Sequence, residues 1–110
     1  MIVRISRVKV DPSRMIEYER HENQSLFLLL KQKGFTSVIF ARGRDECVTI
    51  TLWDYTQAVE VFVTSTPYME TQKKLHEIGM LMSDESVELL EVKGGYVRPT
   101  EAVLEAPTPE

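Results

Sequence analysis

The stretch VTITLWDYTQAVEVF, residues 48–62, decides the fold. Its first half alternates aliphatic side chains with hydroxyl or indole side chains, which predicts a strand with two different faces. In chain order, the aliphatic face holds Val48, Ile50 and Leu52, and the other face holds Thr49, Thr51 and Trp53. Residues 54–56, Asp-Tyr-Thr, are typical of the start of a helix, so the stretch predicts a strand that leads directly into a helix.

The residues before this stretch predict a strand, a helix and a partner strand. β-Branched and basic residues alternate over 2–10, which is typical of a strand. Helical spacing of apolar residues predicts a long helix over 13–33, with Ser13 as its N-cap. Residues 35–42 are rich in β-branched and aromatic side chains, and a polar turn separates them from a second strand at 47–55. These two strands are therefore expected to form a hairpin.

The residues after this stretch predict a broken helix and a last strand. A short helix over 56–63 is interrupted by Thr-Ser-Thr-Pro at 64–67, and a second helical run follows over 68–81. Residues 87–92 have strand composition. Residues 97–110 contain prolines and acids without any period, so we expect a mobile tail there.

The resulting order, β-α-β-β-α-β, predicts one α+β domain over residues 1–96 with a ferredoxin-like fold. Such a fold has a four-stranded antiparallel sheet with its helices on one face. The aliphatic side chains of the strand at 47–55 would be left on the other face, and an apolar face of this kind favours a partner. We therefore expect a homodimer formed by pairing the two sheets.

Composition excludes several classes of protein. The chain has 110 residues and a net charge of −4, and its longest basic cluster is Lys73-Lys74, so we expect no nucleic-acid partner. The longest apolar run is residues 26–30, which is too short to span a membrane, and a single cysteine, Cys47, fits a cytoplasmic protein. No glycine-rich phosphate loop or multi-cysteine spacing is present, so no flavin, nicotinamide or other cofactor and no metal are expected. His21 and Glu17, one helical turn apart, offer two metal ligands where a catalytic site usually needs a third, so they are expected on a solvent-facing helix surface instead.

Three segments together resemble the antibiotic biosynthesis monooxygenase superfamily: the opening strand, the Lys-Gly-Phe junction at 33–35, and the stretch 48–62. The sharpest local marker is Trp53-Asp54 at the strand-to-helix junction, with Ala58 after it. The resemblance covers about residues 2–95. It implies a dimeric α+β barrel in which each subunit keeps a pocket between its own sheet and helices.

The superfamily that the chain resembles contains cofactor-independent quinol-forming oxygenases, haem-degrading enzymes and proteins without an assigned reaction. The oxygenase branch has an asparagine and a tyrosine near its aromatic substrate, and the corresponding positions here hold Thr49 and Val59. The haem-degrading branch has an asparagine, a tryptophan and an iron-binding histidine. The positions that correspond to these three hold Ser6, Phe62, and Thr71 or Gln72.

The candidate site combines one strand face with one helix face. Trp53, Thr49 and Thr51 would give an aromatic wall with two hydroxyls, unless Trp53 only anchors the core. Gln72 and His76 are four residues apart on the helix, and either reach the same cavity or form a solvated stripe. Tyr68 lies one turn earlier and could donate a hydrogen bond to a substrate oxygen, as the alternative to an amphipathic residue at a helix start. His76 is the predicted general base.

These residues lead to three alternative functions. The first is a small cofactor-independent oxygenase that acts on a planar, electron-rich aromatic of the quinol or phenol type. The second is a non-catalytic ligand-binding or assembly dimer of the same fold. The third is a haem-binding or haem-degrading protein with His76 as the iron ligand.

Overall fold

The structure is a computed structural model that describes residues 1–96, so the tail predicted at 97–110 lies outside the described residues. Its helices and strands follow the predicted order. They are β1 (Ile2–Val8), the short 3-10 helix η1 (Pro12–Arg14), α1 (Met15–Leu30), β2 (Phe35–Arg42), β3 (Cys47–Trp53), α2 (Thr56–Val63), α3 (Thr66–Glu77) and β4 (Ser86–Glu91).

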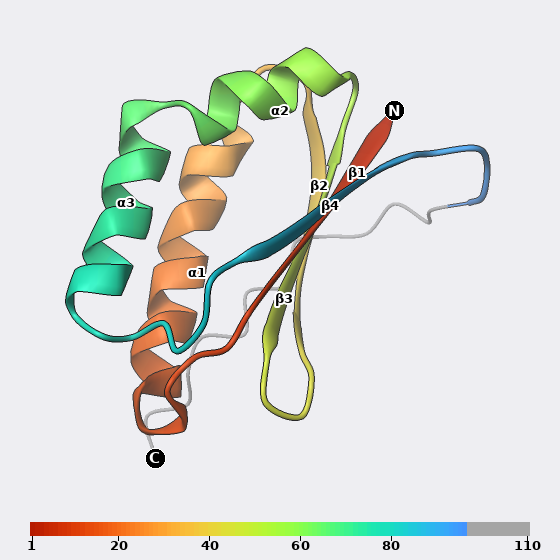
Figure 1. Cartoon of the computed structure of the whole chain (residues 1–110). Helices are drawn as coiled ribbons and strands as arrows, with labels where there is room; N and C mark the ends of the chain where they lie inside the picture. Colours follow the sequence, from red (N-terminus) through yellow and green to blue (C-terminus); the bar gives the residue numbers. More distant parts are fainter. Residues whose placement is uncertain (97–110) are drawn as a thin grey trace.

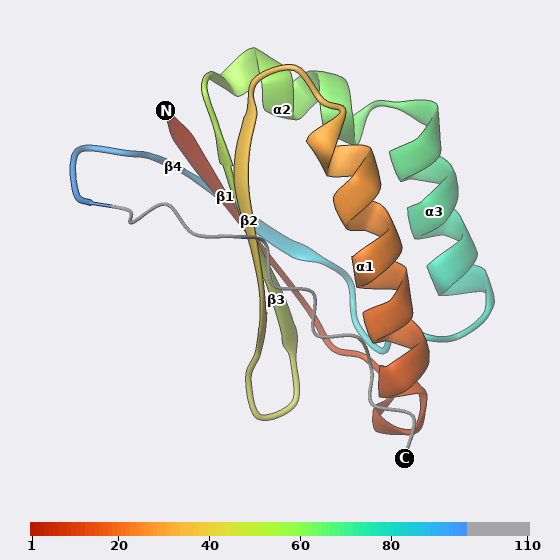
Figure 2. The ribbon, with the colours of Figure 1, turned by 180° about the vertical axis from the view of Figure 1, so that it is seen from behind.

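The four strands form one antiparallel sheet in the order β2-β3-β1-β4, which confirms the predicted ferredoxin-like fold. Helices α1 and α3 run side by side along one face of the sheet, and α2 crosses near its upper end (Figure 1). The reverse view in Figure 2 shows the same layering, with no helix of residues 1–96 on the opposite face. None of the helices in this described part has the length and apolar character needed to cross a membrane.

The register of β1 against β3 fixes which side chains face the helices. Arg4 lies opposite Thr51, and Ser6 lies opposite Thr49, so these four polar side chains share the helix-facing side. Trp53 lies on the same side and is fully buried, as the alternation of residues 48–53 predicts. The opposite side, here called the uncovered sheet face, is mainly aliphatic. It contains Val3, Ile5, Ile39, Val48, Ile50, Leu52 and Leu90.

The start of α1 differs from the prediction. Ser13 was expected to cap a helix beginning at that residue, but the Asp11 carboxylate accepts hydrogen bonds from the Ser13 backbone N–H (3.0 Å) and hydroxyl (2.8 Å). These hydrogen bonds hold the pKa of Asp11 below its usual range. Because Pro12 follows the aspartate, the chain first makes the 3-10 turn η1, and α1 begins only at Met15.

The predicted break between the last two helices is confirmed, but the second of them is shorter than expected. Helix α3 has Pro67 in its first turn and ends at Glu77 rather than at residue 81. Gly79 then adopts a positive φ of 72°, which glycine reaches without steric cost and which ends the helix. The chain turns back so that Leu81 forms an isolated bridge with Val10, beyond the end of β1.

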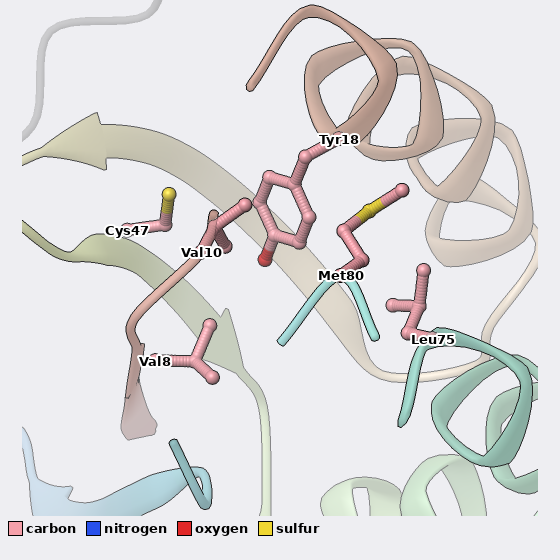
Figure 3. Close-up of a cluster of buried hydrophobic side chains, with 6 residues drawn as sticks. All are labelled: Val8, Val10, Tyr18, Cys47, Leu75 and Met80. Carbon is pink, nitrogen blue, oxygen red and sulfur yellow. The ribbon is translucent and has the colours of Figure 1, made fainter. Parts of the chain in front are cut away.

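Two apolar clusters lie between the sheet and the helices. The first joins β1, α1, β3 and the end of α3, and it consists of Val8, Val10, Tyr18, Cys47, Leu75 and Met80 (Figure 3). The second surrounds the indole of Trp53 and consists of Leu29, Trp53, Ala58, Val59 and Phe62. At its edge, a Cβ atom added to Gly34 would lie 2.8 Å from the Cβ of Ala58, so only glycine allows this close approach.

Cys47 should be nearly inert toward thiol reagents in the folded protein. Its side chain is buried in the first cluster, and burial raises the pKa of the thiol to about 11. At pH 8 the native chain should therefore react with an aromatic disulfide reagent far more slowly than the urea-unfolded chain. Equal rates in the two states would contradict the burial of Cys47.

Candidate functional site

A cavity of about 170 Å³ lies between the helix-facing side of the sheet and helices α1 and α3. Its sheet wall consists of Arg4, Ser6, Phe40, Thr49 and Thr51. Its helical wall consists of Tyr18, His21, Glu22, Gln24, Ser25, Leu28 and Leu29 from α1, with Phe62, Tyr68, Thr71 and Gln72 from α2 and α3. Glu85, just before β4, completes the lining. Gln24 and Leu28 are exposed, so the cavity reaches the molecular surface beside α1.

A charged cluster of four residues, Arg4, Ser6, Tyr68 and Glu85, occupies one part of this wall. The Arg4 guanidinium donates to the Tyr68 hydroxyl oxygen (3.1 Å) and to Glu85 Oε1 (3.4 Å). The Tyr68 hydroxyl donates to Glu85 Oε1 (3.2 Å), and the Ser6 hydroxyl donates to Glu85 Oε2 (2.5 Å). Each polar side chain of the cluster thus has a defined partner.

The cluster is held in place by burial as well as by hydrogen bonds. Arg4 is only 7% exposed, and its guanidinium carbon lies 5.8 Å from the centre of the Tyr68 ring, which suits a cation–π contact. Burial raises the pKa of Tyr68, so its hydroxyl keeps its proton at neutral pH. The cluster therefore presents a fixed cation, a phenol hydroxyl and a carboxylate to the same cavity.

A second charged pair involves Glu22, which also lines the cavity. Glu22 of α1 is buried and forms a two-pronged ion pair with Arg42, at the end of β2. The pKa of Glu22 is raised because burial outweighs the attraction of Arg42. The Arg42 guanidinium also lies 5.7 Å from the ring centre of Tyr18, whose pKa is raised by burial.

Trp53 does not line the cavity, although the sequence suggested it as an aromatic wall. Its ring packs against Phe35 and Phe62, with centroid distances of 5.5 and 5.4 Å, and its indole N–H donates to the Thr51 hydroxyl (2.8 Å). Phe62, which packs on the indole, lines the cavity itself, and Phe62, Phe40 and Tyr68 provide aromatic surface there instead of Trp53. This arrangement corresponds to the core-anchor alternative for Trp53. Thr49 and Thr51 do line the cavity.

His76 also lies outside the cavity, which corrects the expectation that it converges with Gln72. Tyr68 and Gln72 line the cavity, whereas His76 is exposed on α3. The physical reason is the helical repeat: four residues advance a side chain by about 40° beyond a full turn. The step from Tyr68 to Gln72 and the step from Gln72 to His76 each add this rotation, so His76 is turned away from the cavity. Leu75 occupies the buried position in the last turn of α3. The same placement removes His76 as an iron ligand inside this cavity.

His21 was expected on a solvent-facing surface, and for this residue the expectation is wrong. It lines the cavity, its ring centroid lies 6.1 Å from that of Tyr18, and burial lowers its pKa, so the imidazole is neutral at pH 7. Glu17 is exposed as expected and pairs with Arg14 at 2.9 Å. Within residues 1–96 no group of three or more histidine, cysteine, aspartate or glutamate side chains is placed to hold a metal ion.

Sequence reasoning also missed Arg4, Glu22 and Glu85. Arg4 shares its pleat face with Val8, so strand parity could have placed it under the helices. Glu22 lies in a buried α1 stripe whose other members are Tyr18, Leu26 and Leu29. Those spacings of three and four residues are visible in the sequence, but a charged residue within such a stripe is not expected to face the core. Glu85 lies in a connecting segment, and no sequence signal identified it.

No protein-family profile and no curated protein sequence matches this chain. Solved structures do match it. A protein of unknown function from Nitrosomonas europaea is 11% identical with a TM-score of 0.75, over 90% of this chain and 95% of that one. A monooxygenase of Streptomyces coelicolor, solved with nanaomycin D, is 17% identical with a TM-score of 0.71, over 89% and 92%. SnoaB, a cofactor-independent oxygenase of Streptomyces nogalater, is 15% identical with a TM-score of 0.66, over 86% and 94%.

At these identities the likeness shows a shared fold and leaves the chemistry to the residues of the site. Other matched structures are described as antibiotic biosynthesis monooxygenases, including one from Bordetella bronchiseptica that is 20% identical with a TM-score of 0.71. The chain therefore has the fold of the antibiotic biosynthesis monooxygenases, as the resemblance carried by residues 48–62 predicts.

Proposed function

We propose that this protein is a small cofactor-independent oxygenase whose substrate is a planar aromatic molecule of the phenol or quinol type. The observation that carries the proposal is the cavity between sheet and helices, which combines aromatic walls with a buried guanidinium, hydroxyls and carboxylates. A largely apolar pocket with a few convergent polar groups is the usual form of a small-molecule site. Related folds in the monooxygenases described above are consistent with this use.

The size of the cavity limits the substrate. A cavity of about 150 Å³ accommodates benzene, and the cavity here is about 170 Å³. One aromatic ring with small substituents therefore fits without rearrangement of the walls. Larger fused ring systems would require side chains at the mouth, such as Gln24 and Leu28, to move.

The proposed reaction needs no cofactor because the substrate supplies the electrons. When a phenol and O₂ give a quinone and water, one oxygen atom enters the ring and the other leaves as water. The substrate provides all four electrons that reduce O₂. The protein then has three tasks: to accept the phenol proton, to hold the resulting anion, and to keep water away from it.

Oxygen uptake in the presence of single-ring quinols tests this proposal. The wild-type protein should increase the rate of uptake above that of heat-denatured protein. Thr49→Phe, which places a ring in the cavity from the sheet wall, should abolish the increase. Gln57→Phe adds the same ring to an exposed position of α2 and should not change it. Equal uptake by wild type and Thr49→Phe would contradict the proposal.

A non-catalytic ligand-binding module is the second candidate, and the placement of His76 favours it. The histidine that sequence reasoning assigned as the base is exposed and outside the cavity. A binding module would retain the aromatic ligand in equilibrium dialysis without consuming oxygen. In that case, Thr49→Phe should remove binding, and oxygen uptake should equal the background for both proteins.

We also propose that the protein is a homodimer formed through the uncovered sheet face. Ile50 and Leu52 lie on this face, and Ile39 there is 55% exposed. Pairing two such faces should bury more than about 1,000 Å² in total. Sedimentation at micromolar concentration should therefore give a dimer.

Ile50→Glu should shift this dimer to monomer, because it places a charge in the centre of the interface. Val61→Glu introduces the same charge at an exposed position of α2 and should leave the dimer intact. A wild-type monomer, or a dimer that tolerates Ile50→Glu, would contradict pairing through this face.

A further inference from the structure

The proposed oxygenase needs a base inside the cavity, and the charged cluster contains a carboxylate in a suitable position. Glu85 accepts hydrogen bonds from Arg4, Ser6 and Tyr68, so its two oxygens are fixed at the cavity wall. Its side chain is also 25% exposed, which gives a proton a route to solvent. His76, by contrast, does not reach the cavity.

We propose that Glu85 is the proton acceptor of this site and that Arg4 and Tyr68 bind the oxyanion that forms when Glu85 takes the substrate proton. The proposal rests on the proposed function, because it assigns the residues of that same cavity. The proton passes from the substrate hydroxyl to a Glu85 carboxylate oxygen, and the electron pair of the broken O–H bond stays on the substrate oxygen.

Charge balance favours this transfer in a buried site. Before the transfer, Arg4 is neutralised by the Glu85 carboxylate, which lies within 3.4 Å of it. After it, Glu85 is neutral and the substrate oxyanion becomes the partner of Arg4. The net charge of the cluster is unchanged, so no isolated charge is created in a medium of low dielectric constant. The Tyr68 hydroxyl, released from Glu85, can donate to the oxyanion.

Binding of 4-nitrophenol tests the oxyanion site separately from oxygen chemistry. This probe has one ring, and its absorption spectrum distinguishes phenol from phenolate. At a pH below its solution pKa, wild-type protein should increase the phenolate band. The ionisable groups that line the cavity, besides Arg4, Tyr68 and Glu85, are Tyr18, His21 and Glu22, and they are common to every variant compared.

Removal of the anion-binding groups should reduce the phenolate band. Arg4→Met should remove it, and Arg4→Lys, which keeps the positive charge, should restore part of it. Tyr68→Phe removes a single hydroxyl and keeps the ring, so the fold should persist while anion affinity falls severalfold. Unchanged phenolate binding in Arg4→Met and Tyr68→Phe would overturn the assignment of the oxyanion site.

Glu85→Gln should separate binding from catalysis. With the amide oxygen in the place of Oε1, the side chain still accepts hydrogen bonds from Arg4 and Tyr68, and its NH₂ group can donate to the Ser6 hydroxyl oxygen, so the local structure is retained. Because Arg4 no longer has a carboxylate partner, the affinity for added phenolate should rise roughly tenfold. Oxygen uptake with the substrate should fall about 10²–10⁴-fold, as expected for the loss of a general base. Glu60→Gln removes the same charge from an exposed site on α2 and should change neither quantity.

The possible failures are distinguishable. If wild-type protein binds 4-nitrophenol only as the neutral phenol, or if Glu85→Gln binds the phenolate less tightly, the assignment of Glu85 and Arg4 is wrong while the aromatic site stands. If the wild-type cavity binds no single-ring phenol at all, both the assignment and the proposed function are wrong.

Discussion

Replacement of Trp53 by alanine should lower the free energy of unfolding by about 4 kcal/mol. The indole is fully buried, packs against Phe35 and Phe62, and donates its N–H to Thr51. Truncation would leave a cavity beside β3 and remove the hydrogen bond to the Thr51 hydroxyl. Chemical denaturation followed by circular dichroism measures the difference.

The size of the side chain at position 53 should determine how much the free energy of unfolding decreases. Trp53→Phe keeps most of the ring contacts and should cost about 1–2 kcal/mol. Tyr96→Ala removes an aromatic ring that is 82% exposed and should change stability by less than about 0.5 kcal/mol. A loss below about 1 kcal/mol for Trp53→Ala would show that the indole is not the anchor of the second apolar cluster.

Arg42→Met should destabilise the protein by about 3 kcal/mol near neutral pH, because it leaves the buried Glu22 carboxylate without its cation. Burial raises the pKa of Glu22 above its ordinary value of 4.5. At a pH between 4.5 and the raised pKa, the folded protein therefore binds a proton that the unfolded chain has lost. Stability contributed by Glu22 therefore decreases as pH rises through this window and recovers as pH falls.

Loss of Arg42 removes an attraction to the ionised form and should raise the pKa of Glu22 further. The deficit of Arg42→Met relative to wild type should consequently be largest above pH 7 and shrink toward pH 5. Denaturation curves at both pH values measure this difference. Arg44→Met, at an exposed position of the β2–β3 turn, should show a small deficit that does not depend on pH. A pH-independent deficit for Arg42→Met would contradict the pairing with Glu22.

The fold was predictable because its determinants are local. Alternation at 47–53 predicted the two faces of β3, and Pro67 predicted the break between α2 and α3. The predictions were wrong at the ends of helices, where competing hydrogen bonds decide which residue is the first or the last. At the start of α1, for example, the Asp11 carboxylate captures the Ser13 N–H and delays the helix.

The candidate site was predictable only in part. Thr49, Thr51, Gln72 and Tyr68 line the cavity, as strand parity and helical spacing suggested. The charged cluster was missed because most of its hydrogen bonds join residues more than 60 positions apart, such as Arg4 and Tyr68. No periodicity in a single sequence reports such a pairing.

The position of His76 was mispredicted for the same reason, because it depends on contacts that the periodicity of a single sequence does not report. The spacing of four residues from Gln72 was correct for a common helix face. However, the accumulated rotation of α3 and the position of its last turn against the core decide which face reaches the cavity, and these depend on tertiary packing. The buried Leu75 takes that position.

The most direct test of a ligand site between the sheet and the helices is an amide NMR titration of the wild-type protein with a single-ring phenol. The largest chemical-shift changes should occur at residues that line the cavity on β1, β3, α1 and α3, including Ser6, Thr49, Ser25 and Gln72. Thr49→Phe should lose these changes while keeping a dispersed spectrum. Changes confined to the uncovered sheet face, or no saturable change, would contradict a ligand site between the sheet and the helices.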